Sequence, residues 1–315
     1  MSAAAPYADL TPERVLAAVE TLGLATDGRL LALNSYENRV YQVGIEDAAP
    51  VVAKFYRPRR WTDAAIAEEH AFAAELAAAE LPVVAPLIVD GRSLHAVQGH
   101  RLALYPRRGG RAPQLESAEH LQWMGRLIAR IHGIGARTRF AARGAIDLAT
   151  FLQAPAAAVL ASPLLPDTLR ARYRAATDAL EAPLRERFDA AGARGLRLHG
   201  DCHPGNVLWT DHGPHFVDLD DARMGPAVQD LWMLAPEERA LDLLLEGYQE
   251  FRDFDYAELG LIEPLRLLRQ VHWAGWIAQR WHDPAFPQAF PFVAEPRWWE
   301  QHTVDLVEAA LRLQE

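Results

Sequence analysis

The stretch from Leu198 to Asp221, LHGDCHPGNVLWTDHGPHFVDLDD, constrains this chain more than any other. Short apolar runs alternate with turn residues here, which predicts small strands at Leu196–His199, Val207–Thr210 and His215–Leu219. Asp201 and Asn206 stand five residues apart on the loop after the first strand. Asp218 follows twelve residues later, at the end of the second strand of a hairpin. The hairpin would bring all three polar side chains to one place.

This combination of residues suits one kind of chemistry. Phosphoryl transfer from ATP needs a carboxylate near the attacking hydroxyl and oxygen ligands for Mg²⁺. Because Mg²⁺ keeps waters and phosphate oxygens in its shell, a few protein oxygens are enough. Asp201 suits the role of base or hydroxyl-orienting group, while Asn206 and Asp218 suit the metal. Each residue alone would be interpreted as a turn former, but the set favours a phosphotransferase.

Two neighbours of Asp201 carry weaker predictions. His199 is expected to pack and hydrogen-bond so that it holds the loop in place, with no part in proton transfer. Cys202 is either a small buried residue or, beside a catalytic carboxylate, a redox-sensitive thiol.

Lys54 lies in the middle of an apolar run, VVAKFY. A buried lysine is costly unless its charge has a partner, and an ATP phosphate is a natural one. The alternative is an edge strand with the ammonium in solvent. The helix that follows offers Glu68 and Glu69 as ion-pair partners. We favour Glu68, which stands one turn before the apolar Phe72, although Glu69 is close behind.

No glycine-rich phosphate loop precedes Lys54. The segment NSYENRVYQV, from Asn34 to Val43, stands in its place. This turn could contact phosphate through backbone N–H groups and the Ser35 hydroxyl.

The arrangement of predicted elements indicates an α+β protein with two lobes. Thr11 and Thr62 are expected to cap helices, the second running to about Ala79. Strands are expected at Leu30–Leu33, Arg39–Val43, Val51–Tyr56, Pro86–Val89, Leu94–Gln98 and Arg101–Tyr105. Helical periodicity dominates from Ser117 onward. We therefore expect a small β-rich lobe over residues 1–107 and a larger helical lobe over residues 108–315.

Three further segments have plain structural interpretations. The uncharged run Leu148–Pro166 holds three prolines, so it is expected to be a connector and buried loop instead of a membrane span. Arg57, Arg59 and Arg60 are expected to form a solvated turn. The tryptophans of the C-terminal part are expected mainly to fill the helical core, although a substrate groove is an alternative.

Composition narrows the classes of function. Lys and Arg total 32 against 42 Asp and Glu, so the net charge of −10 argues against nucleic-acid binding. Cys202 is the only cysteine, so no internal disulfide can form, which fits a cytoplasmic protein. The start, MSAAAPYADL, lacks the pattern of a signal peptide. We expect a cytoplasmic monomer without membrane association.

The chain resembles a known family in several blocks. HGDxxxxN followed by an apolar strand ending in Asp is similar to the aminoglycoside phosphotransferase and choline kinase group of the protein-kinase-like fold. A closer resemblance is to the bacterial stress response kinase A family, of the RdoA type. The blocks that carry it are LNSYENRVYQ (33–42), KFYRPRRW (54–61), LRLHGDCHPGN (196–206), FVDLDDARMGPAVQDLWML (216–234) and DPAFP (283–287).

The resemblance implies an ATP-dependent serine/threonine protein kinase of the cytoplasm, acting in stress response and cell-death control. It implies Asp201 as the proton acceptor, Asn206 and Asp218 as Mg²⁺ ligands with Asp218 also catalytic, and Ser35 as an ATP contact. HGD replaces the HRD of typical protein kinases, DLD replaces DFG, and no APE ending is recognisable. Regulation by an activation loop is therefore not expected.

Three alternatives stay open at this point. A small-molecule kinase on the same fold, acting on an amino alcohol, aminoglycoside or sugar, would use the same residues. An acidic, enclosed pocket beside Asp201 would favour that reading, and an open groove would favour a protein substrate. A non-catalytic nucleotide-binding protein is the second alternative. The third is a metallohydrolase that uses His199, Asp201, His203, His212 and His215.

Overall fold

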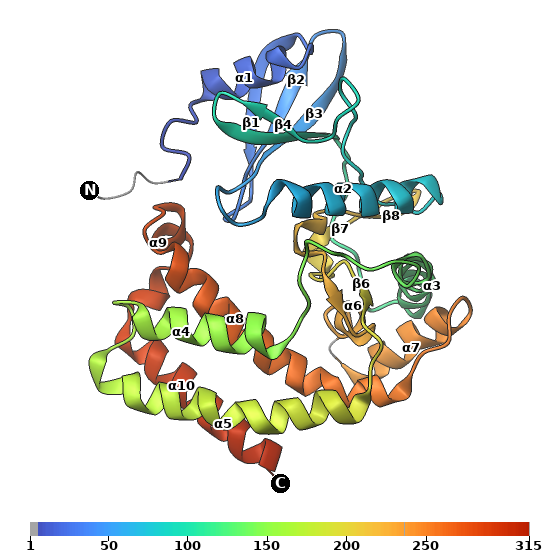
Figure 1. Cartoon of the computed structure of the whole chain (residues 1–315). Coiled ribbons are helices and arrows are strands. Elements are labelled where there is room, and N and C mark those ends of the chain that lie inside the picture. Colours follow the sequence, from blue (N-terminus) through green and yellow to red (C-terminus); the bar gives the residue numbers. More distant parts are fainter. Residues whose placement is uncertain (1–5, 236, 315) are drawn as a thin grey trace.

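A five-stranded antiparallel sheet forms the N-terminal part of the computed structural model, which describes residues 6–235 and 237–314 (Figure 1). The strand order is β1-β2-β3-β5-β4. The strands are β1 (Thr26–Leu33), β2 (Arg39–Ile45), β3 (Ala48–Phe55), β4 (His95–Val97) and β5 (His100–Pro106). The first five residues, part of the segment considered for a signal peptide, lie outside the described residues.

Helix α1 (Pro12–Thr21) covers this sheet. Its N-terminus is capped as predicted, since the Thr11 side chain accepts a hydrogen bond from the Arg14 backbone N–H. Val15 and Val19 of α1 pack with Val43, Phe55 and Leu104 of the sheet in one apolar cluster.

Helix α2 (Asp63–Ala78), capped by Thr62 as predicted, lies between the sheet and the helices (Figure 1). Its residues Phe72 and Leu76 belong to the large core that it shares with the helices, not to the core of the sheet. Helix α2 is thus packed against the helical part of the molecule.

Helices build most of the remaining chain. In chain order they are α3 (Ala118–Gly135), the π-helical turn η1 (Ala149–Gln153), α4 (Ala154–Ala161), α5 (Asp167–Ala191), α6 (Val228–Trp232), α7 (Glu238–Gln249), η4 (Tyr256–Leu261), α8 (Ile262–Arg280), α9 (Ala285–Ala289), η5 (Pro291–Ala294) and α10 (Pro296–Gln314). Helices α3 and α7 lie against each other, as do α5 and α10.

Between α5 and α6 stands the predicted β island. A β7–β8 hairpin (Val207–Thr210 and Gly213–Phe216) pairs Val207 with Phe216, and a second pair joins β6 (Leu196–Arg197) to β9 (Met224–Gly225). Two single turns of 3₁₀ helix, η2 (Pro204–Asn206) and η3 (Leu219–Asp221), flank the hairpin. The Phe216 backbone N–H donates to the Pro82 carbonyl, which ties the island to the segment after α2.

Two predicted elements are wrong. No strand covers residues 86–89, where only an isolated bridge joins Val89 to Arg92. The run from Leu148 to Pro166 is largely helical, as η1 and α4, and not a loop. Pro155 stands in the first turn of α4, where the missing N–H would have no helical partner, so it starts the helix instead of breaking it.

No described helix is both long and apolar enough to cross a membrane. The molecule is of the mixed α+β class, with sheet first and helices after. The division at residue 107 stays a prediction, although β5 ends at Pro106 and the next helix begins only at Ala118.

Candidate active site

A close backbone contact and buried hydrogen bonds hold the loop that carries Asp201. Gly200 has a φ of +84°, and a Cβ there would lie 2.1 Å from the Asp221 carbonyl oxygen, so only glycine fits. The carboxylate of Asp230, 1% exposed, accepts hydrogen bonds from the backbone N–H groups of His199 (2.8 Å) and Gly200 (2.9 Å). His199 Nε2 donates to the Val217 carbonyl at 2.9 Å, which confirms its expected role in holding the loop.

Asp201 itself contacts an arginine, a histidine and an amide. Its Oδ1 accepts a hydrogen bond from Arg269 at 2.7 Å, and its Oδ2 lies 3.5 Å from His203 Nε2. Asn206 donates its amide N–H to the Asp201 backbone carbonyl at 2.9 Å. Burial alone would raise the pKa of Asp201, but His203 and Arg269 outweigh it and hold that pKa below the usual value. Asp201 is therefore a carboxylate at neutral pH, as a proton acceptor must be.

Asp218 has an unusual backbone. Its φ is +59°, in the left-handed region that residues other than glycine rarely adopt. Such strain recurs at functional sites, where the surrounding structure maintains it. The side chain is 52% exposed and its Oδ1 lies 2.9 Å from Lys54 Nζ.

Lys54 is 5% exposed and is surrounded by carboxylates. Besides Asp218, it lies 3.2 Å from Asp220 Oδ1 and 3.9 Å from Glu69 Oε1. Burial alone would lower the pKa of Lys54, but these three negative charges raise it well above its usual value. The alternative of a solvated edge-strand lysine is wrong, because β3 lies between β2 and β5.

The preference for Glu68 as the partner of Lys54 is wrong, because Glu69 is the residue of α2 that faces the lysine. Glu69 also lies 3.5 Å from Arg143, and both are buried. Burial raises the pKa of Glu69 above its usual value, although Lys54 opposes this. Glu68 points elsewhere and accepts hydrogen bonds from three consecutive backbone N–H groups, those of residues 141–143. The two neighbours differ by about 100° around the helix, which decides their roles.

A cavity of about 310 Å³ opens between the sheet and the β island. Ser35, Lys54 and Glu69 line it from one side, and Asn206 and Asp218 from the other. Apolar side chains complete the lining: Leu33, Val40, Val52, Ala73, Val84, Leu208, Val217 and Leu219. An apolar cleft that ends in a lysine and hard oxygen donors suits a nucleotide with its phosphates.

The donors fit Mg²⁺ in kind. The amide nitrogen of Asn206 is used by Asp201, which leaves its oxygen for a ligand, and the half-exposed Asp218 offers a carboxylate. Asp220 does not compete for this role. It is 3% exposed, pairs with Lys54 and Arg60, and accepts a hydrogen bond from Asn38 Nδ2 at 3.1 Å.

A second pocket, of about 380 Å³, lies between α8 and α10. Arg269, which contacts Asp201, lines it together with Arg266, Gln270, Trp273, Trp298, Gln301, His302 and Asp305. Asp201 itself lines neither pocket. It contacts Asn206, which lines the first pocket, and Arg269, which lines the second.

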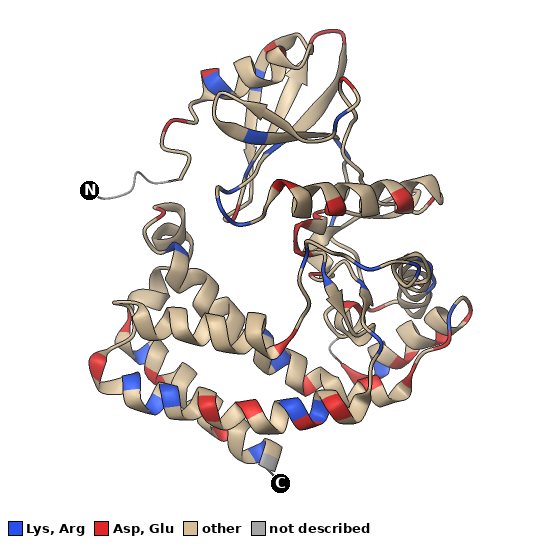
Figure 2. Ribbon diagram, viewed as in Figure 1, with Lys and Arg blue, Asp and Glu red and all other residues tan. Residues whose placement is uncertain are grey.

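The prediction of a solvated arginine turn is wrong for two of its three members. Figure 2 shows basic residues along the loop between β3 and α2, and this loop faces the helical part of the molecule. Arg57 is 6% exposed, and its guanidinium pairs with Glu37 and Asp283. Arg60 pairs with Asp220 and Asp221. Arg59 alone is exposed.

Four site residues escaped the sequence analysis: Arg143, Asp220, Asp230 and Arg269. Asp220 and Asp230 stand in the quoted block 216–234, where their burial could have been suspected because an acidic side chain amid apolar ones needs partners. Arg143 and Arg269 lie in unremarkable segments, and their contacts cross long distances in sequence.

The metallohydrolase alternative lacks its metal centre. Among residues 6–235 and 237–314, no three His, Cys, Asp or Glu side chains gather as they would around a metal ion. The five residues named for that alternative therefore do not form a site of its kind.

Known proteins share this architecture. A family described as "Phosphotransferase enzyme family" matches residues 29–262. Among solved structures, an amicoumacin kinase in complex with AMP-PNP, Ca²⁺ and its antibiotic aligns with a TM-score of 0.70 over 94% of this chain and 93% of its own, at 17% identity. A microcompartment-associated aminopropanol kinase aligns with a TM-score of 0.68 over 95% and 99%, at 19% identity. These two likenesses show the fold.

Curated relatives are much closer in sequence. "Stress response kinase A" of Escherichia coli (strain K12) is 44% identical over 98% of this chain and 95% of its own length. "Serine/threonine protein kinase RdoA" of Salmonella typhimurium is 44% identical with the same coverage. With the kinase-like fold, and with Lys54, Asn206 and Asp218 lining one cavity, this near full-length identity shows that the chain is a phosphotransferase of the stress response kinase A family.

Proposed function

We propose that this protein is an ATP- and Mg²⁺-dependent serine/threonine protein kinase that acts in bacterial stress response and protection from cell death. The observation that carries the proposal is that Lys54, Asn206 and Asp218 line one nucleotide-sized cavity. Asp201 contacts Asn206 of this cavity and Arg269 of the second pocket. The printed name of the Salmonella relative supports the protein-kinase assignment. We further propose a cytoplasmic monomer with a nucleotide lobe over residues 1–107 and a catalytic lobe over residues 108–315.

In this proposal each polar residue of the cleft has one task. Lys54, oriented by Glu69, and Ser35 bind the phosphates of ATP. Asn206 and Asp218 would hold Mg²⁺, which supplies charge neutralisation on the transferred phosphoryl group. Asp201 accepts the proton of the attacking hydroxyl as the new oxygen–phosphorus bond forms, while the bond between the γ-phosphorus and the β–γ bridging oxygen breaks and ADP leaves.

The pocket beside Asp201 bears on the nature of the acceptor. Its lining has two arginines, one aspartate and two tryptophans. A dicationic or polycationic substrate such as an aminoglycoside would need several carboxylates there. The lining therefore favours a hydroxyl carried by a neutral or acidic segment of protein.

A small-molecule alcohol is the second candidate acceptor. Two solved structures of this fold are kinases of small molecules by their titles, one of them of aminopropanol. The aromatic wall of Trp273 and Trp298 could also hold such a compound.

The test is a phosphorylation assay with radiolabelled ATP, in which protein substrates and a panel of amino alcohols and sugars are compared. Wild-type protein should label protein hydroxyls, and Asp201→Asn should lower kcat by about 10²- to 10⁴-fold while nucleotide binding is retained. Efficient labelling of a small alcohol with no protein labelling would replace the first candidate by the second. Full labelling by Asp201→Asn would refute the assignment of the base.

A further inference from the structure

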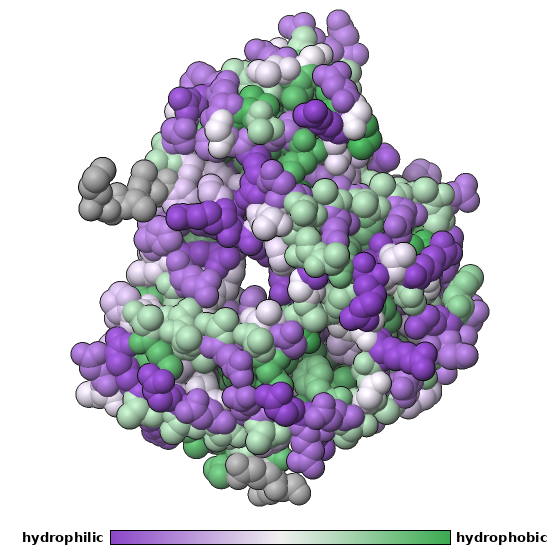
Figure 3. Space-filling view, viewed as in Figure 1, coloured by the Kyte–Doolittle hydropathy of each residue, from purple (hydrophilic) through white to green (hydrophobic). Residues whose placement is uncertain are grey.

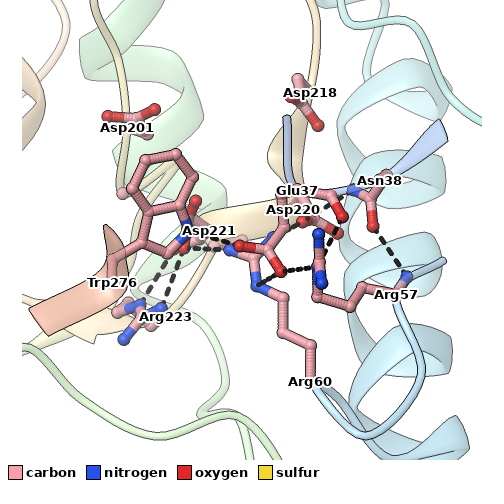
Figure 4. A network of polar contacts seen from close by, with 12 residues as sticks. Glu37, Asn38, Arg57, Arg60, Asp201, Asp218, Asp220, Asp221, Arg223 and Trp276 are labelled. Carbon is pink, nitrogen blue, oxygen red and sulfur yellow. Dashed lines mark hydrogen bonds and ion pairs between the residues drawn. The ribbon is translucent and has the colours of Figure 1, made fainter. Parts of the chain in front are cut away.

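The turn between β1 and β2 is held in part by side chains of the helical part of the molecule, outside the sheet that carries the turn. Ser35 lines the nucleotide cavity, but Glu37 and Asn38 are 9% and 3% exposed and point into the interface with the helices (Figure 4). A glycine-rich loop would reach phosphate through its own flexible backbone. This turn has no glycine, so its position must come from its side chains.

Glu37 is the centre of the first anchor. One carboxylate oxygen lies 2.9 Å from Arg57 Nε of its own sheet. The other lies 2.7 Å from Arg280 Nε and accepts a hydrogen bond from the indole N–H of Trp276. Trp276 and Arg280 both belong to α8. A single buried carboxylate therefore joins the turn to a helix some 240 residues later in the chain.

Asp283, immediately before α9, forms the second anchor. It is 1% exposed and lies 3.0 Å from Arg39 and 2.5 Å from Arg57. Arg39 begins β2 and Arg57 follows β3, so the anchor holds the start of β2, beside the turn, and the segment after the neighbouring strand β3. We call Glu37, Arg39, Arg57, Trp276, Arg280 and Asp283 the turn clamp.

Helix α8 connects the turn clamp to the catalytic base. Arg269, Trp276 and Arg280 follow one another at spacings of seven and four residues, which places them on one face of the helix. Arg269 holds Asp201, while Trp276 and Arg280 hold Glu37. One rigid element thus fixes both the acceptor side and the phosphate side of the cleft.

The turn clamp is sensitive to the loss of any partner. Breaking a buried ion pair by removing one partner is far more costly than breaking an exposed one, because the other charge stays buried without compensation. Glu37 faces three guanidinium groups, those of Arg57, Arg60 and Arg280, so its neutralisation would leave all three without a counter-charge on the turn. Figure 3 shows a hollow in the middle of the molecule that is bordered largely by hydrophilic residues. A cavity of about 190 Å³, lined in part by Arg60, Trp276 and Arg280, lies beside the turn clamp.

We propose that Glu37 is a positioning residue of the nucleotide site, which acts through the turn clamp to hold Ser35 over the phosphates. The turn clamp positions the phosphate-binding turn, which is the role of the glycine-rich loop in proteins that have one. The inference rests on the proposed function, since it assumes that the cavity at Lys54 binds ATP.

The experiment uses Glu37→Gln, which keeps the shape of the side chain and removes its charge. KM for ATP should rise roughly tenfold or more, because hydrogen bonds to a charged group are lost, while kcat at saturating ATP changes little. Release of a fluorescent ADP analogue should be faster by a similar factor. Glu46→Gln is the matched control, because Glu46 is exposed at the far end of the same sheet and should change neither quantity.

A merely structural role would lower the melting temperature and leave KM for ATP and ADP release unchanged, and that result would overturn the inference. If Glu37→Gln does not fold, Trp276→Phe, which removes the indole N–H and makes the ring smaller, should shift KM in the same direction by a smaller factor. Wild-type protein without ATP turnover would refute the proposed function alone, because binding of the ADP analogue still tests the turn clamp.

Discussion

At the scale of single residues, two aspartates only two positions apart have different environments. Asp218 is half-exposed at a left-handed backbone position, and Asp220 is buried among Lys54, Arg60 and Asn38. The Asp220 carboxylate is buried against two cations and an amide, whereas the half-exposed carboxylate of Asp218 is open to the cavity.

Asp218→Asn should therefore raise the Mg²⁺ concentration needed for half-maximal activity by about tenfold or more, since the metal loses a charged ligand. Asparagine tolerates the left-handed region, so the fold should persist. A Mg²⁺ titration of phosphotransfer measures the effect. Asp211→Asn, an exposed aspartate in the β7–β8 turn, is the control. Identical titrations for Asp218→Asn and wild type would rule out the metal role.

Glu68 and Glu69 form a natural pair for a second prediction. Glu69→Gln should raise KM for ATP several-fold, because Lys54 loses one of its orienting charges. Glu68→Gln should leave KM unchanged and lower the free energy of unfolding by about 1–3 kcal/mol, because an amide cannot accept all three backbone N–H groups of residues 141–143. Steady-state kinetics and urea unfolding on both variants separate the two outcomes. An effect of Glu68→Gln on KM would contradict the assignment.

Sequence reasoning could not choose between these two glutamates. Both stand on α2 after Lys54, and the apolar pattern of an alanine-rich helix hardly marks one face. The choice is made by Arg143, which enters from a loop 74 residues later and fixes Glu69. Lys54 was easier to predict, because a charge within an apolar strand needs a partner wherever the strand lies.

At the scale of elements, α3 and α7 approach each other through paired glycines. A Cβ on Gly125 of α3 would lie 2.0 Å from the Leu244 carbonyl oxygen, and a Cβ on Gly247 of α7 would lie 2.0 Å from that of Gln122. Both obstacles are backbone atoms, which cannot swing aside as a side chain can. The distance between the two helices is thus set by the absence of side chains.

Gly125→Ala should lower the free energy of unfolding by about 1–3 kcal/mol or more, through forced separation of α3 and α7. Gly133, on the same helix, has open space around its Cα. Gly133→Ala should be neutral or stabilise the protein by up to about 1 kcal/mol, because alanine favours the helix. Urea or thermal unfolding compares the two. Equal effects would show that helix propensity and not contact governs position 125.

Elements were predicted well where a local signal exists and poorly where it does not. The caps Thr11 and Thr62 are marked by residue type and appear where expected. The prediction of a loop around Pro155 was wrong because proline disfavours the interior of a helix but suits its first turn, and the sequence alone does not show where a helix begins. The distances between helices, as at Gly125, have no local signal at all.

At the scale of the whole molecule, buried histidines make stability depend on pH. Burial lowers the pKa of His70, His272 and His302 to about 4. In the unfolded chain these groups titrate near their usual value of about 6.5. Since their folded pKa is depressed, the stability they contribute is present above about pH 6.5 and is lost as the pH falls toward 4. Glu69 and Glu258, whose pKa values burial raises, act in the opposite sense.

The free energy of unfolding should thus fall by several kcal/mol between about pH 7 and pH 4.5, on the order of 1 kcal/mol per pH unit for each histidine. Urea unfolding at a series of pH values measures the slope. His302→Gln should flatten it, while His212→Gln, at an exposed position, should leave it unchanged. A pH-independent stability over this range would mean that these histidines stay accessible to protons.

The general architecture followed from sequence, since strand-rich and helix-rich regions are separate along the chain. That Asn206 and Asp218 line one cavity could also be foreseen from the hairpin between them. The turn clamp could not, because it joins Glu37 to α8 and Arg57 to Asp283 across more than 200 residues. Solvated and buried arginines look alike in sequence when their partners are so remote.

The single cysteine gives the molecule a further property. Cys202, the neighbour of Asp201 in sequence, is 1% exposed, and burial raises the pKa of its thiol well above the usual value, with Asp230 and Asp201 adding to the effect. Peroxides attack the thiolate and not the thiol. A kinase built this way would go on transferring phosphate under oxidative stress, while proteins with exposed, acidic thiols around it are being inactivated.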